Sequence, residues 1–530
     1  MRLVQIVDAV RPRTVLQARD EVNISGVALD SRLVDRGALF AALSGARTDG
    51  ADYARQAEAR GAAAILTEHS SPLTGLPQLV VDDARKALAL AARTFYDHPD
   101  RELRMGAVTG TNGKSTTAYL VRHILSTTGL RCGLMGTIEY DLGSKQIPAP
   151  MTTPDAPELF GGLRSMQEAG CEACVLEASS HSLCQHRLEG IEFDAAGFTN
   201  LTQDHLDFHR TMQEYREAKA MLFLRLPAKA TAVLNMDDDA GRYYAKQTRA
   251  AVVGYSLKGS RRAELRARVK SMDIHGTRFF LESPWGKREL EWKLVGEHNL
   301  QNALVAIGMA LAMGEGAGHT FSFDRVLSAL EDFPGVPGRL ESVGDGLAPF
   351  RVLVDYAHTD DALRNVLTAL RQLRPSRMLV VFGCGGDRDK TKRPKMGRVA
   401  EELADLGILT SDNPRTENPR TILAEVYAGI QNRGKFSVEE DRAKAIGLAI
   451  REARAGDVVL IAGKGHEDYQ VVGTEKRHFD DRKEALAALK KRFGNKPSTR
   501  RRAEPESTDA KKTDSQRRFF DLTRLVRTII

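Results

Sequence analysis

The sequence of 530 residues has few cysteines and lacks a long apolar segment. Its five cysteines are an odd and sparse set, which argues against a disulfide framework and is typical of a reducing compartment. No apolar run approaches the ~18 residues that indicate a transmembrane helix. The first residues, MRLVQIVDAVRPRT, are broken by charges, so they make a poor signal peptide. We therefore expect a cytoplasmic protein without a membrane span.

The sequence also lacks a strongly basic body, although its net charge is +7. Residues 496–530 hold ten Lys and Arg against five Asp and Glu, so this end accounts for most of the excess. The rest of the chain is close to neutral, which argues against nucleic acid as a partner. From Asn495 the composition turns to charged residues, Ser, Thr and Pro, which predicts a disordered tail over residues 495–530.

The single CxxC pattern, Cys171 to Cys174, allows two interpretations. A zinc or redox site is one of them, but the usual zinc spacing and a following thioredoxin-like unit are both missing. The other is a strand over Cys174–Glu177 whose cysteines behave as small hydrophobic residues. We favour the strand.

Short apolar strands alternate with helical segments through most of the chain, which predicts an α/β fold. The expected strands are Ala62–Leu66, Met105–Val108, Cys174–Glu177, Ala232–Asn235, Arg351–Tyr356, Met378–Gly383 and Val458–Gly463. The expected helices include Ala84–Tyr96, Ser115–Thr127, Asn302–Met313, Ala362–Leu373 and Thr421–Asn432. Residues 255–295 differ, because alternating polar and apolar positions with Gly276 and Gly286 predict a β-hairpin excursion.

The chain is too long for one core, and at ~150 residues per domain its length predicts three or four units. Segments rich in Pro, Gly and Asp occur near residues 97–100 and 333–338, and each precedes a new strand. We therefore expect domains over residues 1–98, 99–337 and 338–494, followed by the tail.

A glycine-rich segment, Gly110-Thr111-Asn112-Gly113-Lys114-Ser115-Thr116, follows an apolar strand and opens a helix. Glycines let the backbone turn so that amide N–H groups and the helix N-terminus face phosphate oxygens. Lys114 can reach the outer phosphates, and the Ser115 hydroxyl can bind Mg²⁺. A purely structural turn is the alternative, but the Lys-Ser pair favours nucleotide binding.

Further motifs follow in a fixed order. They are Glu177-Ala-Ser179-Ser-His181, Thr199-Asn200-Leu201, Asp204-His205-Leu-Asp-Phe-His209, Gly296-Glu-His-Asn299-Leu-Gln-Asn302, Gly338-Arg339-Leu-Glu341, Asp355-Tyr-Ala-His358-Thr359 and Asp412-Asn413-Pro414-Arg415. Together with the phosphate loop, over residues from about 20 to 490, they resemble the Mur ligases, which build the peptide of bacterial peptidoglycan.

The resemblance implies three domains: an N-terminal domain for the UDP end of the substrate, a central ATPase domain, and a C-terminal Rossmann-like domain that delivers an amino acid. It implies an ATP- and Mg²⁺-dependent ligase that activates a carboxylate as an acyl-phosphate. The branch that it matches adds meso-diaminopimelate to UDP-N-acetylmuramoyl-L-alanyl-D-glutamate. We expect a monomer whose partners are small molecules.

Bringing two anions together requires cationic groups and a metal ion. The resemblance implies that Ser115, Glu177, His205 and Lys219 hold the metal, with Lys219 carbamylated by CO₂, a reaction that needs a neutral amine. Lys114 completes the catalytic set. Taken alone, Lys219 reads as a solvated helix lysine and His205 as an ordinary exposed histidine.

The resemblance also implies the substrate contacts. The UDP-muramoyl-dipeptide is expected at Leu29, Ser31, Ala46, Arg47, Thr48, Thr152, Thr153, Ser179, Gln185 and Arg187, and Arg187 offers a fork for an anion. ATP is expected at the phosphate loop and at Asn299, Arg339, Asp355 and His358. The family's His-Thr-Pro-Asp reads His358-Thr-Asp-Asp361 here, which leaves the shape of that loop open.

Diaminopimelate differs from lysine by a second carboxylate, for which Arg415 is the expected buried fork. Arg388 is expected at the other polar end, and Glu467 faces an ammonium. The full set is Arg388, Asp412, Asn413, Pro414, Arg415, Gly463 and Glu467. Alone, Asp-Asn-Pro-Arg could be an ordinary turn.

Two other classes remain as alternatives. The first is a related amide ligase: one that adds lysine, one that adds D-Ala-D-Ala, or a folylpolyglutamate synthase. Such a ligase would keep the phosphate loop and lose Asp-Asn-Pro-Arg. A nonenzymatic nucleotide-binding regulator would have no need for Glu177, His205 and Lys219 together.

Overall fold

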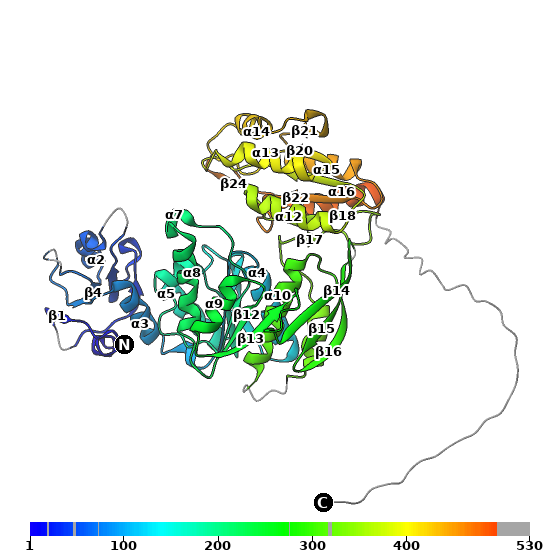
Figure 1. Cartoon of the computed structure of the whole chain (residues 1–530). Coiled ribbons are helices and arrows are strands. Elements are labelled where there is room, and N and C mark those ends of the chain that lie inside the picture. Colours follow the sequence, from blue (N-terminus) through cyan, green and yellow to red (C-terminus); the bar gives the residue numbers. More distant parts are fainter. Residues whose placement is uncertain are drawn as a thin grey trace, which may run out of the picture.

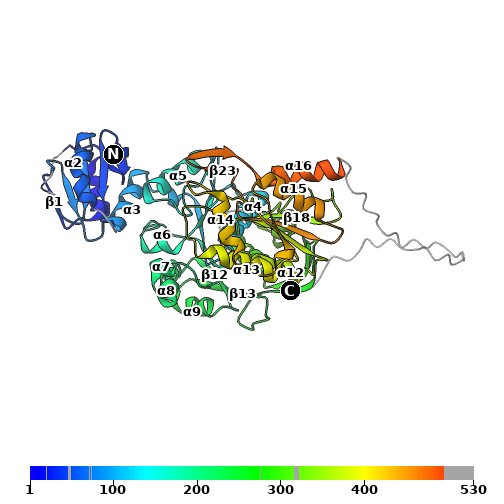
Figure 2. The same cartoon turned by 90° about the horizontal axis from the view of Figure 1, so that it is seen from above.

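The computed structural model describes residues 1–494 except 19–20, 46–48, 71, 73, 275 and 316–320. Three large sheets follow one another along the chain, and Figure 1 shows them as three bodies, with the first beside the central one and the third above it. The same arrangement is seen from above in Figure 2. Among the described residues, no helix has both the length and the apolar character needed to cross a bilayer. The predicted tail, 495–530, lies outside the described residues.

The first sheet has five strands in the order β1-β5-β4-β3-β2, and only β1 runs antiparallel to its neighbour. Its elements are α1 (Leu3–Val10), β1 (Thr14–Leu16), β2 (Gly26–Ala28), η1 (Ser31–Leu33), β3 (Ala38–Ala42), η2 (Gly50–Tyr53), α2 (Ala54–Ala59), β4 (Ala64–Thr67), β5 (Gln78–Val80) and α3 (Ala84–Phe95). Strands β3, β4 and β5 are buried along their whole length, as parallel strands covered on both faces should be.

The central sheet has eleven strands in the order β16-β15-β14-β13-β12-β11-β6-β10-β7-β8-β9. Its first elements are η3 (Pro99–Arg101), β6 (Arg104–Thr109), α4 (Lys114–Thr128), β7 (Cys132–Met135), β8 (Glu139–Asp141), β9 (Gln146–Pro148), α5 (Ala156–Glu168), β10 (Ala173–Glu177), α6 (Ser180–Cys184) and β11 (Ala195–Phe198). The rest are α7 (Leu206–His209), α8 (Met212–Leu224), β12 (Thr231–Asn235), α9 (Asp239–Gln247), β13 (Ala251–Ser256), β14 (Leu265–Asp273), β15 (Gly276–Ser283), β16 (Gly286–Trp292), α10 (Glu297–Gly314) and α11 (Phe323–Glu331).

The third sheet has six strands in the order β17-β18-β22-β19-β20-β21, parallel except for β17. Its elements are β17 (Glu341–Ser342), β18 (Arg351–Asp355), α12 (Asp360–Gln372), β19 (Met378–Phe382), α13 (Lys392–Leu403), β20 (Leu406–Leu409), α14 (Pro419–Tyr427), η4 (Arg433–Lys435), β21 (Phe436–Val438), α15 (Arg442–Glu452), β22 (Val458–Ala462) and α16 (Asp481–Phe493). A separate hairpin joins β23 (Tyr469–Val472) to β24 (Glu475–His478).

Strand β6 lies in the middle of the central sheet, between β10 and β11. Val108 pairs with Glu177 of β10, and Thr109 pairs with Phe198 of β11. The chain runs from β6 toward β7 on one side and returns to β11 on the other, so the strand order reverses at β6. Ligands of open α/β sheets bind outside the carboxyl ends of the strands at such a reversal. The phosphate loop occupies this position.

The core beneath the phosphate loop is formed by α4 and α10 packed on the sheet. Helix α10 is apolar on nearly all sides and is buried along most of its length, as a central helix should be. Gly106 of β6 allows this packing, because a Cβ there would lie 2.7 Å from the Met313 sulfur. Close contact between β6 and α10 therefore fixes where the loop after β6 begins.

Most of the expected elements are present, and one expected helix ends earlier than predicted. Residues 255–295 contain two hairpins, β14–β15 and β15–β16, as the glycines at their turns predict. The expected helix over Thr421–Asn432 is wrong at its end, because α14 stops at Tyr427. Gly429 packs so tightly on α13 that a Cβ there would lie 1.9 Å from the Pro394 carbonyl oxygen. A turn, rather than another helical turn, allows that approach.

Candidate active site

The phosphate loop requires glycine at both of its predicted glycine positions. Gly110 has φ of 152° and Gly113 has φ of 85°. A Cβ at Gly110 would lie 1.9 Å from the Thr199 hydroxyl oxygen, and one at Gly113 would lie 2.2 Å from the Asn302 side-chain oxygen. No larger residue fits without moving the loop from β11 or α10.

Hydrogen bonds from the segment after β11 hold the loop in place. The Thr111 amide donates to the Asn200 carbonyl at 2.8 Å, and the Asn112 amide donates to the Asn200 side-chain oxygen at 3.1 Å. The Thr199 hydroxyl donates to the Asn112 carbonyl at 2.6 Å. Thr199 and Asn200 belong to a motif in the sequence, but their role as supports of the loop was not predicted.

Two lysines meet on one carbonyl oxygen at the start of the loop. The Lys114 ammonium donates to the Gly110 carbonyl at 3.0 Å and to the Thr111 carbonyl at 2.8 Å. The Lys219 ammonium donates to the same Gly110 carbonyl at 2.8 Å. Burial lowers the pKa of Lys114, and the negative charges of Glu177 and Asp204 oppose that change. The loop therefore brings two lysine side chains together where phosphates would bind.

Lys219 is buried, with 1% of its surface exposed, so the interpretation as a solvated helix lysine is wrong. It lies four residues after Tyr215 on α8, which places both side chains on the same helix face. The Lys219 nitrogen lies 4.4 Å from the centre of the Tyr215 ring. Burial lowers the pKa of Lys219 well below its usual value, and the charge of Lys114 lowers it further. This environment favours a neutral amine.

Glu177 ends β10 beside the phosphate loop and is 1% exposed. One carboxylate oxygen accepts the Thr137 amide at 2.8 Å, and the other accepts the Thr137 hydroxyl at 3.0 Å. Ser115 and Thr116 are buried in the first turn of α4. Thr137, which fixes the carboxylate, was not predicted, and no motif in the sequence points to it.

The predicted muramoyl-peptide residues form a connected group next to Glu177. The Thr153 hydroxyl lies 2.5 Å from the Glu177 carbonyl oxygen and 3.3 Å from the Ser179 hydroxyl, and the Thr152 hydroxyl lies 3.1 Å from that of Thr137. Arg187 donates to the Thr153 carbonyl at 2.7 Å and to the Gln185 side-chain oxygen at 2.8 Å. It also pairs with Asp155 at 3.0 Å. These contacts orient Arg187 toward the site.

His205 lies in a left-handed turn before α7, with φ of 52°. Its side chain is 45% exposed and pairs with Asp204 at 3.4 Å. Its ring centre lies 5.0 Å from that of His181. Within the described part of the chain, no group of three His, Cys, Asp or Glu side chains is arranged to hold a metal ion.

The predicted ATP contacts outside the loop lie at the start of the third sheet and on α10. Asp355 is buried and accepts the amides of Leu340 at 2.8 Å and Ala357 at 2.9 Å, while burial raises its pKa. The Arg339 guanidinium lies 5.1 Å from the Tyr356 ring. His358 is exposed, with its Nδ1 2.9 Å from the Tyr356 carbonyl. On α10, the Asn299 amide group donates to the Val295 carbonyl at 2.8 Å.

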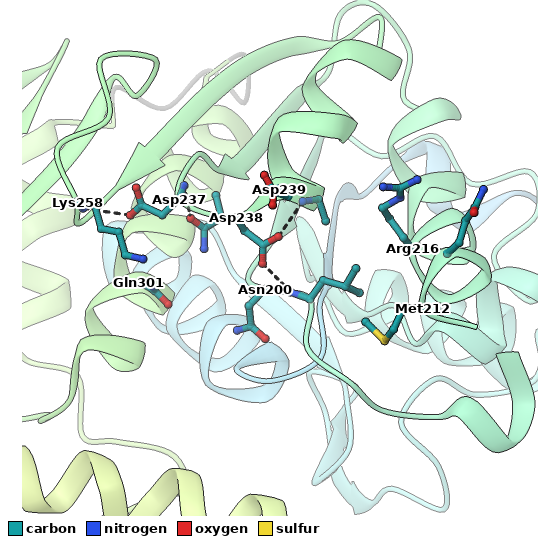
Figure 3. A pocket seen from close by; sticks show the side chains of 12 residues that line it. Asn200, Met212, Arg216, Asp237, Asp238, Asp239, Lys258 and Gln301 are labelled. Carbon is teal, nitrogen blue, oxygen red and sulfur yellow. Dashed lines mark hydrogen bonds between the residues drawn. The ribbon is translucent and has the colours of Figure 1, made fainter. Parts of the chain in front are cut away.

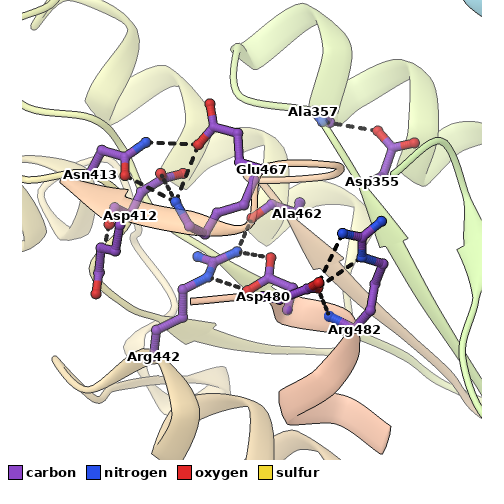
Figure 4. Close-up of polar contacts among 12 residues, drawn as sticks. Asp355, Ala357, Asp412, Asn413, Arg442, Ala462, Glu467, Asp480 and Arg482 are labelled. Carbon is purple, nitrogen blue, oxygen red and sulfur yellow. Dashed lines mark hydrogen bonds and ion pairs between the residues drawn. The ribbon is translucent and has the colours of Figure 1, made fainter. Parts of the chain in front are cut away.

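A buried polar cluster contains several of the residues predicted to bind the amino acid (Figure 4). The Asn413 amide nitrogen donates to Glu467 at 2.9 Å, and the Lys464 ammonium donates to the Asn413 oxygen at 3.0 Å. Gly463, with φ of 122°, lies so near that a Cβ would be 2.4 Å from an Asp412 carboxylate oxygen. Lys464 was not predicted, although it stands within the Gly463-Lys-Gly-His-Glu467 motif.

The two predicted arginines lie beside this cluster. Arg415 has φ of 51°, and its guanidinium donates to the Gly386 carbonyl at 2.8 Å. It is half-buried, so the expectation of a fully buried guanidinium is wrong. The reason is that its segment lies along the β23 edge, with the Arg415 amide donating to the Val471 carbonyl at 3.0 Å. Pro414 packs on Gly386, and Arg388 is exposed in the loop after β19.

An ion pair with no exposed surface holds the backbone next to this cluster. Arg442 on α15 donates to Asp481 at 2.7 and 2.6 Å and to the Ala462 carbonyl, the residue before Gly463, at 3.0 Å (Figure 4). Removing one partner of such a pair leaves an uncompensated buried charge.

We therefore expect Arg442→Met to lower the free energy of unfolding by about 3–5 kcal/mol. The control is Arg420→Met, which breaks the pair with Glu440, where the side chains are 84% and 45% exposed. The control should cost no more than about 1 kcal/mol. Denaturant titration of both variants measures the difference, and equal losses would contradict the assignment of a supporting role to Arg442.

Five of the residues predicted to contact the UDP-muramoyl-dipeptide lie within residues 1–98, and two of these five are in the described part of the chain. Ser31 is buried and donates to the Gln56 side-chain oxygen at 2.7 Å, while Leu29 is 38% exposed. Ala46, Arg47 and Thr48 lie outside the described residues. Leu29 follows β2 and Ser31 begins η1, so both lie in the part of the chain built around the first sheet.

A pocket of about 550 Å³ adjoins the phosphate loop through Asn200 (Figure 3). Its lining includes Asn235, Asp237, Lys258 and Gln301. Asp237 accepts the amides of Leu257 and Lys258 at 2.8 and 3.2 Å, so it is committed to the fold.

Comparison with known families places the chain. Residues 23–96 match the Mur ligase family catalytic domain, residues 108–310 the Mur ligase middle domain, and residues 338–465 the Mur ligase glutamate ligase domain. The chain belongs to the Mur ligase family. It therefore has the three-domain mixed α/β architecture of these amide ligases, as the motifs predict.

Curated relatives of the same family match nearly the whole chain. The UDP-N-acetylmuramoyl-L-alanyl-D-glutamate–2,6-diaminopimelate ligase of Geobacter metallireducens is 44% identical over 492 residues, covering 88% of this chain and 94% of the relative. The ligase of the same name from Geobacillus kaustophilus is 45% identical over 478 residues, covering 89% and 96%.

Solved structures agree with this placement. A UDP-N-acetylmuramoyl-L-alanyl-D-glutamate–2,6-diaminopimelate ligase is 35% identical, with a TM-score of 0.66, over 88% of this chain and 95% of the other. MurF from Thermotoga maritima, solved in complex with ADP, has a TM-score of 0.57 at 20% identity over 90% and 100%. At that identity the second likeness concerns the fold alone.

Proposed function

We propose that this chain joins meso-diaminopimelate to the D-glutamate carboxylate of UDP-N-acetylmuramoyl-L-alanyl-D-glutamate, using ATP. The substrate carboxylate attacks the γ-phosphorus and releases ADP. The amine of diaminopimelate then attacks the acyl-phosphate, forms the amide and releases phosphate and a proton. The observation that carries this proposal is the cluster of Asp412, Asn413, Arg415 and Glu467, which offers a cation and an anion for an amino acid with two charged ends.

ATP phosphates are proposed to bind on the loop at Gly110–Thr116, where Lys114 already donates to loop carbonyls. The adenine base of ATP would extend into the pocket beside Asn200. The site would be completed by Asn299, Arg339, Asp355 and His358. The positive charge of Arg339 helps to lower the pKa of Lys114, so Arg339 lies near the proposed phosphate site. Closure of the third domain on the central one would bring these groups together.

Mg²⁺ takes oxygen ligands and commonly binds through one or two carboxylates plus substrate phosphates. The buried Glu177 carboxylate and the Ser115 hydroxyl at the phosphate loop fit that chemistry, and His205 lies on the adjoining turn. Bound Mg²⁺ would neutralise the charge of the two anions as they meet. Lys219 would join as a carbamate, because a carbamate supplies the oxygen ligands that Mg²⁺ prefers and an amine does not.

The remaining predicted residues are proposed to hold the UDP-muramoyl-dipeptide. Leu29, Ser31 and residues 46–48 would bind its UDP end, and Thr152, Thr153, Ser179, Gln185 and Arg187 its peptide end. We propose domains at residues 1–98, 99–337 and 338–494, each built on one of the three large sheets. We also propose a monomer whose partners are small molecules. Five free thiols support the cytoplasm as its location.

The test is a set of assays with ATP, the UDP-muramoyl-dipeptide and a panel of amino acids. Phosphate release that depends on diaminopimelate supports the proposal. Release with lysine, glutamate or D-Ala-D-Ala instead would favour a related amide ligase, and no amino-acid dependence would favour a nucleotide-binding regulator.

Arg415 is expected to decide between diaminopimelate and lysine. Lysine lacks the second carboxylate, so the Arg415 guanidinium would lose a charged partner. Because Arg415 is half-buried, we expect Arg415→Ala to lower kcat/KM for diaminopimelate roughly 30-fold, which corresponds to a loss of about 2 kcal/mol of transition-state stabilisation. The control is Arg420→Ala, an exposed arginine of the same domain. If wild type used lysine as well as diaminopimelate, this role of Arg415 would be wrong even for a true ligase.

A further inference from the structure

Lys464 lies at the centre of the polar cluster of Asp412, Asn413 and Glu467, with none of its side chain exposed. Its ammonium donates to the Asn413 side-chain oxygen at 3.0 Å and to a Glu467 carboxylate oxygen at 3.3 Å. It also pairs with an Asp412 carboxylate oxygen at 3.7 Å. An ammonium carries three protons, so one lysine reaches each of the three polar side chains around it.

Lys464 and the Val471 amide together fix which way the Asn413 amide points. The Asn413 oxygen accepts from the Lys464 ammonium and from the Val471 amide at 2.9 Å. Both of these groups are donors only, so a flipped amide would place its NH₂ against them. The Asn413 nitrogen must therefore face Glu467, to which it donates at 2.9 Å.

This arrangement occupies one oxygen of Glu467 and leaves the other. Both donors, Asn413 and Lys464, bind the same Glu467 oxygen, Oε2. In Figure 4 the second carboxylate oxygen points away from both. Asp412 and Glu467 together carry two negative charges and Lys464 one positive charge. The cluster thus keeps one net negative charge beside an available oxygen, which suits an incoming ammonium group.

We propose that Lys464 is a positioning residue for the amino-acid substrate, holding Asn413 and Glu467 in the geometry that binds its ammonium group. The inference rests on the proposed function, because that function places an amino acid against this polar cluster. Without Lys464, Asp412 and Glu467 would have no cation between them, and the Asn413 oxygen would keep only the Val471 amide as a donor. Amino-acid binding would weaken, while the phosphate loop and the proposed UDP-substrate contacts, which lie in the first two domains, would stay intact.

The experiment compares Lys464→Met with Lys476→Met in the full-length protein. The Lys476 nitrogen lies 4.4 Å from the Tyr469 ring and the Lys464 nitrogen lies 5.7 Å from the same ring, so both variants remove a cation from one tyrosine. Lys476 is exposed on β24 and is the matched control. We expect Lys464→Met to raise KM for diaminopimelate on the order of 10- to 100-fold, with KM for ATP and for the UDP-substrate unchanged.

The outcomes separate the possibilities. A folded Lys464→Met protein with unchanged KM for diaminopimelate overturns the inference, and so does a parallel rise of all three KM values. If Lys464→Met does not fold, Lys464→Gln, which keeps one donor, should show an intermediate rise; unfolding of both would make Lys464 structural and overturn the inference. If wild type uses a different amino acid, the proposed function fails, and the same comparison with that amino acid still tests Lys464.

Discussion

Replacing Lys114 by alanine is expected to reduce kcat on the order of 1000-fold while the protein remains folded. The ammonium folds back onto the carbonyls of Gly110 and Thr111, so it stands over the loop where transferred phosphate would lie. Its charge stabilises the additional negative charge that develops as the phosphoryl group moves. Single-turnover formation of ADP measures the chemical step directly.

The control for this experiment is Lys229→Ala. Lys229 is 76% exposed just before β12, at the opposite end of the central sheet from the phosphate loop. It should behave as wild type in the same assay. Wild-type rates of ADP formation in a folded Lys114→Ala protein would show that the glycine-rich turn has only a structural role.

The phosphate loop could be predicted from the sequence because its requirements are local. Tight turning and a helix start need Gly110, Gly113 and Lys114 in fixed order, and each is visible in the sequence. The contacts that exclude a Cβ come from Thr199 and Asn302, which lie far along the chain. Their motifs were visible, but only the sheet order β11-β6-β10 and the packing of α10 bring them to the loop.

Burial of charged side chains was the part that sequence patterns could not supply. Lys219 and Lys464 look like ordinary lysines, since solvated lysines are the rule. Their burial follows from neighbours in other elements: the Gly110 carbonyl for one, and Asn413 with Glu467 for the other. Arg415 differs in the other direction: it was expected to be buried, but its place along the β23 edge leaves it half-buried.

Replacing Lys219 is expected to lower activity on the order of 100- to 1000-fold. The proposed reaction is addition of the neutral amine to CO₂, which gives a carbamate and releases one proton. Lys219→Ala should therefore lose the carbamate signal that ¹³CO₂ gives in the NMR spectrum of the wild type. Short carboxylic acids should restore part of its activity by supplying the missing anion. An unmodified amine in an active complex would refute the carbamate.

The stability of Lys219→Met should move in the opposite direction from its activity. The folded-state pKa of Lys219 lies well below the ordinary value of 10.5, so between those values the unfolded chain binds a proton that the folded chain does not. The resulting penalty on folding is absent above pH 10.5 and grows as the pH falls toward the lowered pKa. Methionine has no such penalty and keeps most of the packing.

Lys219→Met should thus be at least as stable as the wild type at neutral pH, and its advantage should shrink as the pH approaches 10.5. Denaturant titrations of both proteins at several pH values, in buffer freed of CO₂, measure this difference. A variant that is both inactive and strongly destabilised at neutral pH would mean that Lys219 serves the fold through its bond to the Gly110 carbonyl. An inactive and stable variant is the expected result, because burial of the Lys219 charge costs folding free energy that methionine does not lose.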